Sequence, residues 1–172
     1  MVVLVQKLLG IITSSIFQSK YYLIFDLEMA KKLHTLQFEE DYDFILLGIF
    51  CAYRDYRLCF DINRKLEVSM ERQQDLELKL EKKGSSSLFS IFSCDNSDEE
   101  LYFIICNKGS NGYFVPEMKQ IDYFLMIKNY SRYTAVADIS LKLRELKIVN
   151  GVIEVELSQI KSSENFLMID HV

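Results

Sequence analysis

The single proline of this 172-residue chain, Pro116, limits what the middle of the chain can fold into. Proline lacks the backbone amide that a helix interior or a central strand needs, and it pushes the residue before it into an extended conformation. Apolar runs lie on both sides of it, at 113–115 and 123–127. We therefore predict a corner around Pro116 that ends one group of strands and leads into a new strand over 121–128.

Alternation of apolar and polar residues predicts further strands. Over 75–81, leucines point to one side and charged residues to the other, which is typical of an antiparallel sheet with one face on a core. The apolar runs 88–94 and 101–106 predict two more strands that continue it as a meander. Two strands are also predicted outside this group, at 33–38 and 152–157.

Three other segments have helical character. The run 44–53 is almost entirely apolar and follows acidic residues that suit a helix start, so we predict a helix buried on most sides. Beyond Asp55, which we expect to act as a cap, 56–66 predicts a second, amphipathic helix with apolar residues at 56, 59, 60 and 66. A third helix is predicted over 133–148.

These elements follow one another in the order β-α-α-β-β-β-β-α-β. Strands grouped in the middle of a chain with helices around them are typical of an α+β fold. We predict an antiparallel sheet of about five to six strands with helices packed mainly on one face. The apolar residues at 166–169 in the C-terminal tail are expected to dock on this body.

The first 28 residues differ from the rest of the chain. They are apolar but interrupted by polar residues, they lack the long clean run of a transmembrane segment, and they have no small-residue cleavage site. Because Met29 is followed by Ala30 and two lysines, it resembles a bacterial start site. We predict that 1–28 is a non-native upstream extension or disordered leader and that 29–172 is a single α+β domain. A weak membrane-associating or signal-like leader is the alternative.

Charge and cysteine usage argue against several classes of site. The net charge of −5 argues against nucleic-acid binding, which depends on basic surfaces. The four cysteines form no C-x-x-C pair and only two histidines occur, so we expect no metal site and no cofactor. Each cysteine lies in an apolar run, which favours reduced, buried thiols in a cytoplasmic protein; disulfides in an exported protein are the alternative.

The corner itself carries the motif Val115-Pro116-Glu117-x-x-x-Ile121-Asp122-Tyr123. It resembles the pattern that names the IPExxxVDY family, with Val in place of Ile at the start and Ile in place of Val before Asp. The resemblance extends from about residue 29 to the tail, including 39–44, 55–58, 75–78 and 111–113. It implies a bacterial, Bacteroidota-type protein in the cytoplasm, and it implies no chemistry, because the family has no established activity.

Two interpretations of the motif remain. Glu117, Asp122 and Tyr123 could form an acid–base site, with Arg54 or Arg57 as partners. Alternatively, Pro116 shapes a corner in which the acids bond to backbone amides, and the arginines only pair with nearby acids on a helix surface. We favour the corner, because turn chemistry explains every member of the motif.

The function expected on this basis is a small cytoplasmic binding or interaction module without catalysis of its own. Its partner would be a protein or a small molecule. An enzyme built around Glu117, Asp122 and Tyr123 is the alternative.

Overall fold

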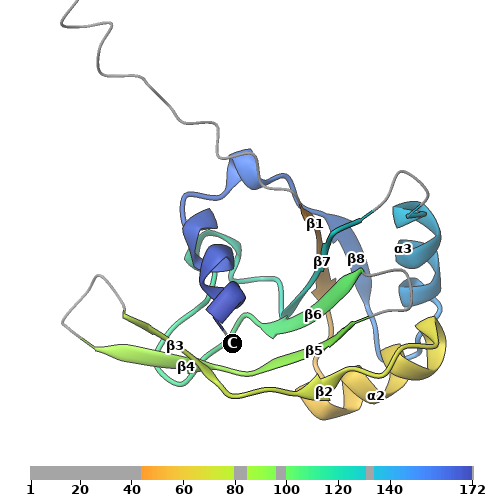
Figure 1. Ribbon diagram of the computed structural model, residues 1–172, viewed down its shortest axis with the longest axis horizontal. Helices are drawn as coiled ribbons and strands as arrows, with labels where there is room; N and C mark the ends of the chain where they lie inside the picture. The colour runs from red at the N-terminus through yellow and green to blue at the C-terminus, as the bar shows by residue number, and fades with distance from the viewer. Residues whose placement is uncertain (1–43, 80–84, 96–99, 131–133, 172) are drawn as a thin grey trace, which may run out of the picture. The chain divides into compact units, whose positions relative to one another are not determined.

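The computed structural model describes residues 44–79, 85–95, 100–130 and 134–171 (Figure 1). The main elements are the strands β1 (Phe44–Phe50), β2 (Glu71–Arg72), β3 (Leu76–Lys79), β4 (Ser86–Phe89), β5 (Ile91–Asp95), β6 (Leu101–Cys106), β7 (Tyr123–Lys128) and β8 (Gly151–Glu154), and the α-helices α2 (Asp55–Leu66) and α3 (Val136–Arg144). Three 3-10 segments complete them: η1 (Pro116–Met118), η2 (Leu157–Gln159) and η3 (Ser163–His171).

Six of the strands form one antiparallel sheet in the order β2-β5-β6-β7-β1-β8. β7 lies inside this sheet between β6 and β1, and Leu125 at its middle is paired with Ile104 on one side and Leu47 on the other. Five consecutive residues of β7 are buried, because both faces of the sheet are covered at this point. β3 and β4 pair with each other in a separate two-stranded sheet.

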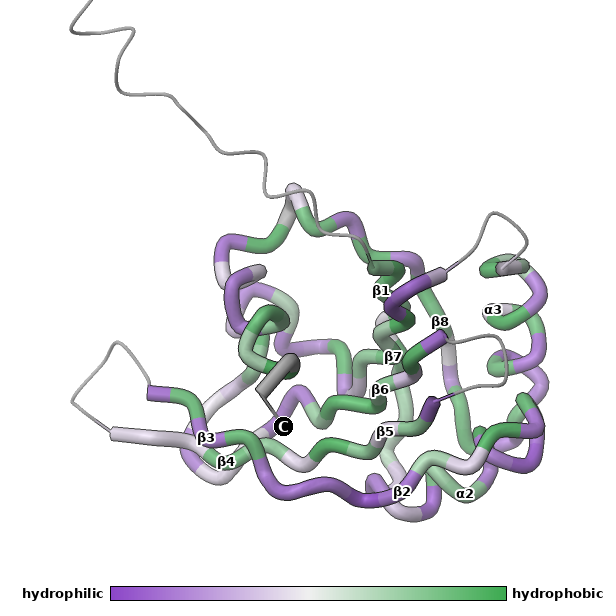
Figure 2. Tube along the Cα trace, in the orientation of Figure 1, coloured by the Kyte–Doolittle hydropathy of each residue, from purple (hydrophilic) through white to green (hydrophobic). Residues whose placement is uncertain are grey.

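Each face of the large sheet carries its own hydrophobic core. On one face, sheet residues such as Leu47 and Leu125 pack with Leu58 and Ile62 of α2 and with Leu143 of α3. On the other face, the core includes side chains from the sheet, from β3 and β4, from the chain before η1 and from η3. Figure 2 shows that the central strands, which lie between the two cores, are mostly apolar. The mixed α+β fold with an antiparallel six-stranded sheet agrees with the prediction.

The first predicted helix is wrong, since 44–50 forms strand β1. Its apolar run belongs to an inner strand that is covered on both faces, and such a strand has no alternation that separates it from a buried helix. α2 therefore follows a strand and not another helix. The strand predicted at 33–38, the acidic residues 39–43 and the boundary at residue 28 lie outside the described residues.

Other element boundaries also differ from the predictions. The run 88–94 does not form one strand, because β4 and β5 are separated at Ser90 and belong to different sheets. The predicted meander is therefore split between the two sheets. α3 and β8 are shorter than predicted, and the strand at 101–106 has the predicted bounds. Among the helices described, none has the length and apolarity needed to span a membrane.

The C-terminal tail docks on the body as predicted. Phe166 of η3 is fully buried, with its ring centroid 5.0 Å from that of Phe114 and 5.6 Å from that of Phe124, both in edge-on geometry. The amide of the neighbouring Asn165 side chain donates to the Phe114 carbonyl at 2.6 Å. The tail is thus part of the second core.

We predict that Phe166→Ala lowers the free energy of unfolding by about 3–5 kcal/mol, because it leaves a large cavity among aromatic rings. Leu167→Ala is the matched control, since Leu167 is an exposed neighbour on the same segment, and we expect it to cost less than about 1 kcal/mol. Urea unfolding of both variants provides the comparison. Equal stabilities of the two variants would show that the tail is not part of the core.

Candidate functional site

The predicted corner is built by the motif around Pro116. Val115 is extended, and Pro116 begins η1, where the missing amide is not needed. The amide of Met118 donates to the Val115 carbonyl at 3.1 Å, and the amide of Ile121 donates to the Met118 carbonyl at 3.0 Å. Val115 and Ile121 are buried and anchor the corner (residues 115–122) at both ends, so that β7 begins at Tyr123.

A residue outside the motif, Asn107, holds the corner together. Its side chain is fully buried, and its amide nitrogen donates to the carbonyls of Met118 at 2.9 Å and Ile121 at 2.8 Å. Its side-chain oxygen accepts from the amide of Val115 at 2.8 Å. No sequence pattern singled out this asparagine, since side-chain bonds to a distant loop leave no periodic signal.

The last two motif residues form hydrogen bonds with the end of β1 and with the segment that joins β1 to α2. Asp122 accepts the amide of Cys51 at 2.8 Å through Oδ2, and its own amide donates to the Ile49 carbonyl at 3.1 Å. The hydroxyl of Tyr123 donates to the Tyr53 carbonyl at 2.6 Å. We call these contacts the clamp, because they fix both the end of β1 and the turn that leads into α2.

Glu117 engages a different part of the chain. Its Oε2 accepts the hydroxyl of Ser162, just before η3, at 2.7 Å. The two acids of the motif are thus bonded to segments on opposite ends of the corner, Glu117 to the C-terminal tail and Asp122 to the β1–α2 turn. Pro116 is exposed and contributes backbone shape.

The two candidate arginines belong to the start of α2. Arg54 is the N-cap, and its carbonyl accepts the amides of Arg57 at 3.0 Å and Leu58 at 3.1 Å. Arg57 pairs with Asp61 at 3.3 Å, one helical turn further on, as predicted for this arginine. The position of Asp55 was predicted less well: it is the first helical residue and not the cap.

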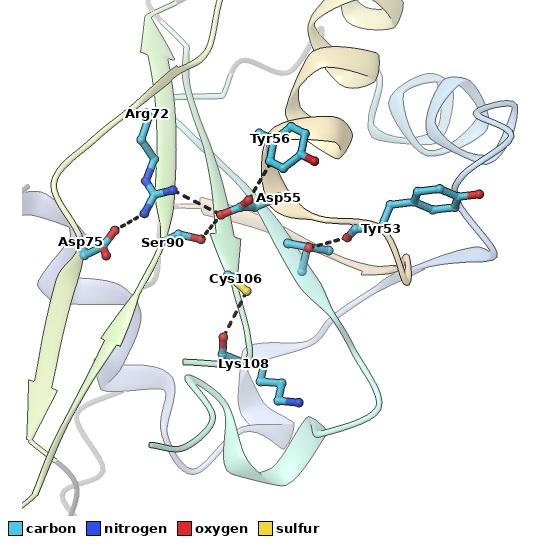
Figure 3. A network of polar contacts seen from close by, with 9 residues as sticks. Tyr53, Asp55, Tyr56, Arg72, Asp75, Ser90, Cys106 and Lys108 are labelled. Carbon is cyan, nitrogen blue, oxygen red and sulfur yellow. Dashed lines mark hydrogen bonds and ion pairs between the residues drawn. The ribbon is translucent and has the colours of Figure 1, made fainter. Parts of the chain in front are cut away.

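Asp55 is instead the centre of a polar network, shown in Figure 3. Its Oδ2 accepts the hydroxyl of Ser90 at 2.8 Å and lies 3.3 Å from Nη1 of Arg72. Arg72 also pairs with Asp75, and its guanidinium lies over the ring of Phe92. The network therefore ties the first residue of α2 to β2 and to the chain between β4 and β5.

Burial raises the pKa of the clamp residue Tyr123 and of three cysteine thiols. Burial raises the pKa of the Cys51 and Cys106 thiols, and it raises the pKa of Cys59 to about 11. Burial also raises the pKa of the Tyr123 hydroxyl, with a further contribution from the nearby Cys106. At neutral pH these groups are protonated, so the hydroxyl acts as a hydrogen-bond donor and the thiols are not activated nucleophiles.

A second feature is the outward side of α2. Leu58, Cys59 and Ile62 are the residues that this helix buries. Tyr56 and Phe60, which we counted among its apolar residues, point to solvent with exposed fractions of 64% and 51%. The usable signal was the spacing of Leu58 and Ile62, which defines the buried stripe and leaves the two aromatics on the opposite side.

Arginines accompany these exposed aromatics. The guanidinium carbons of Arg57 and Arg64 lie 5.8 Å and 5.7 Å from the centroid of the Phe60 ring. Tyr53, in the turn held by the clamp, is 57% exposed. We call this surface the aromatic–arginine face, and it consists of Tyr53, Tyr56, Arg57, Phe60 and Arg64.

A hollow of about 350 Å³ lies at the C-terminal end of this face. It is lined by Phe60, Asn63, Arg64, Val68, Ser69, Met70 and Glu71. Asn63 fixes its wall, since its side chain donates to the carbonyl of Met70 and accepts from the amide of Met70, both at 3.0 Å. The hollow is therefore formed by a turn that is bonded to the helix.

No protein family, curated protein or solved structure was found to match this chain. The resemblance to the IPExxxVDY family stays a prediction. Within the described part of the chain, no group of three or more His, Cys, Asp or Glu residues is placed to hold a metal ion.

We predict that Asn107→Ala destabilises the protein by about 3 kcal/mol, because it leaves two carbonyls and one amide of the corner without their partner. Gln120→Ala, an exposed position in the same corner, is the control and should change stability by less than about 0.5 kcal/mol. Thermal and urea unfolding measure both. A stability loss for Asn107→Ala no larger than that of the control would contradict the role given to Asn107.

Proposed function

We propose that this protein is a non-catalytic binding module and that the aromatic–arginine face is its contact surface for a protein partner. The observation that carries the proposal is Phe60, half exposed between two arginines on a helix whose opposite side is fully used by the core. Tyrosine, phenylalanine and arginine are enriched at protein interfaces, and tyrosine and arginine are enriched among the residues that dominate binding energy.

The way α2 is held supports this assignment. Its N-terminal end is tied down by the Asp55 network, and the preceding turn is held by Asp122 and Tyr123. A surface that is already ordered loses less conformational entropy on binding than a loose one. The motif then has a structural task, which is to fix the turn that presents the contact surface.

The enzyme alternative has less support. Asp122 and Tyr123 are bonded to backbone groups of the β1–α2 turn, and Glu117 is bonded to the tail. A raised pKa of the Tyr123 hydroxyl makes it a poor general base at neutral pH. These contacts favour the structural interpretation of the motif over an acid–base one.

We place this module in the cytoplasm. All four cysteines are free thiols, which fits a reducing compartment. The motif around Pro116 resembles the IPExxxVDY pattern, and this resemblance favours a bacterial protein of that family.

We predict that a Tyr56→Ala/Phe60→Ala variant loses its physiological partner while it keeps its stability. The partner would be captured from the native host with the wild-type chain, identified, purified and titrated by calorimetry. Loss of two interface aromatics should weaken binding by at least about 30-fold, equivalent to one strong hot spot. Leu141→Ala/Leu167→Ala removes exposed apolar residues elsewhere and should bind as wild type does.

Two results would contradict the proposal. One is unchanged affinity of the Tyr56→Ala/Phe60→Ala variant for the purified partner. The other is loss of binding in a stable Glu117→Ala variant, which would move the contact surface to the motif and restore its functional interpretation.

A further inference from the structure

We infer that the partner segment recognised by the aromatic–arginine face is an acidic peptide segment with one large apolar side chain, and this inference rests on the proposed function. The solvent side of α2 and its cap carries three exposed arginines, Arg54, Arg57 and Arg64, and one exposed acid, Glu67. This surface is therefore positive although the whole chain has a net charge of −5. A partner with negative charge would match it.

Two of these arginines, Arg57 and Arg64, are held in place before any partner arrives. Arg57 is bonded through Nε to Asp61, whose side chain is largely buried. Arg57 and Arg64 both also lie against the Phe60 ring. A guanidinium offers five N–H donors in a planar fork that matches a carboxylate, so an oriented pair of arginines favours Asp or Glu in a partner.

The hollow beside Phe60 offers apolar contacts from Phe60, Val68 and Met70 among polar lining residues. The hollow is shallow and open to solvent, and its volume of about 350 Å³ is large enough for a leucine or phenylalanine side chain. The turn that forms it is ordered by the left-handed residue Glu67, with φ 59°, and by the amide of Val68, which donates to the Asn63 carbonyl at 3.1 Å. An anchor in such a preformed pocket loses little ordering entropy.

The distribution of charge along α2 also predicts the orientation of the bound peptide. Glu71 lines the hollow and Glu67 lies at the C-terminal end of α2, so acidic residues of a partner are disfavoured there. Arg57 and Arg54 lie toward the N-terminal end, where the helix dipole is also positive. The apolar anchor is thus expected in the hollow, with the acids running from it toward the start of α2.

A nucleic acid is the less favoured occupant. Arginines and exposed aromatics occur in RNA-binding surfaces too, but strong binding needs many phosphate contacts and a basic balance. Here three arginines are flanked by Glu67 and Glu71, and the chain as a whole is acidic. A single-stranded RNA is therefore included in the test as a competing ligand.

The test is a selection of short random peptides displayed on phage, with the full chain as the target, followed by synthesis of the enriched peptides and fluorescence polarisation at low and high salt. We expect peptides with acidic residues beside one Leu, Phe or Tyr, bound more weakly at high salt. The Arg57→Glu/Arg64→Glu variant should bind these peptides at least about tenfold more weakly than the wild type. The Lys142→Glu/Lys147→Glu variant, changed on and after α3, should bind them as the wild type does. Replacing their Asp and Glu with Asn and Gln should weaken binding by a similar factor.

The outcomes separate this inference from the proposed function. Neutral or basic peptides that lose binding in the Tyr56→Ala/Phe60→Ala variant overturn acidic recognition and leave the face as a contact surface. Acidic peptides that bind this variant as they bind the wild type overturn both proposals. An RNA that binds more tightly than every selected peptide and is lost in Arg57→Glu/Arg64→Glu, or a selection that enriches no sequence, overturns the inference.

Discussion

The arrangement of this fold depends on the clamp that Asp122, just before β7, and Tyr123, its first residue, place on the chain leaving β1. Asp122 accepts the amide of Cys51, and Tyr123 donates to the carbonyl of Tyr53. These bonds link the inner strand β7 to the turn before α2, across about 70 residues of sequence. Two partly buried backbone groups of an irregular turn find hydrogen-bond partners in this way, and the direction of α2 is fixed at its start.

The clamp is itself set by what lies before it. Asn107, at the end of β6, determines the path of the corner, and the corner determines where β7 begins and which side chains it aims at the turn. Asp55 adds an independent attachment, since it ties the first residue of α2 to Ser90 and Arg72. The clamp and the Asp55 network thus both hold the N-terminal end of α2. They order the helix that carries the aromatic–arginine face on its outer side.

Local patterns predicted part of this structure. The alternation around Leu76 and Leu78, the apolar run at 101–106 and the missing amide of Pro116 each depend on chemistry within a few residues, and the strands and the corner occur there. β1 was mistaken for a helix because burial on both faces removes the alternation. That assignment needs the neighbouring strands β7 and β8, which only the three-dimensional fold supplies.

The candidate site was likewise predicted only in its local features. The motif was visible in the sequence, and its role as a corner followed from turn chemistry. The partners of its side chains, Cys51, Tyr53 and Ser162, could not be predicted, since hydrogen bonds to groups 45 to 71 residues away have no sequence signature. Tyr56 and Phe60 were read as apolar helix residues, although Leu58 and Ile62 already defined a different buried side.

The most direct test of the clamp is amide hydrogen exchange in the wild type and in Asp122→Ala, with Cys51, Arg57 and Leu58 as reporters and Leu125 of β7 as the reference. Local opening and global unfolding are separated by such a comparison. We predict that protection of the three reporters falls by at least about tenfold more than that of Leu125, because the turn and the first turn of α2 are released while the sheet persists. An equal fall at all four amides would show that α2 does not depend on the clamp, and would contradict this account.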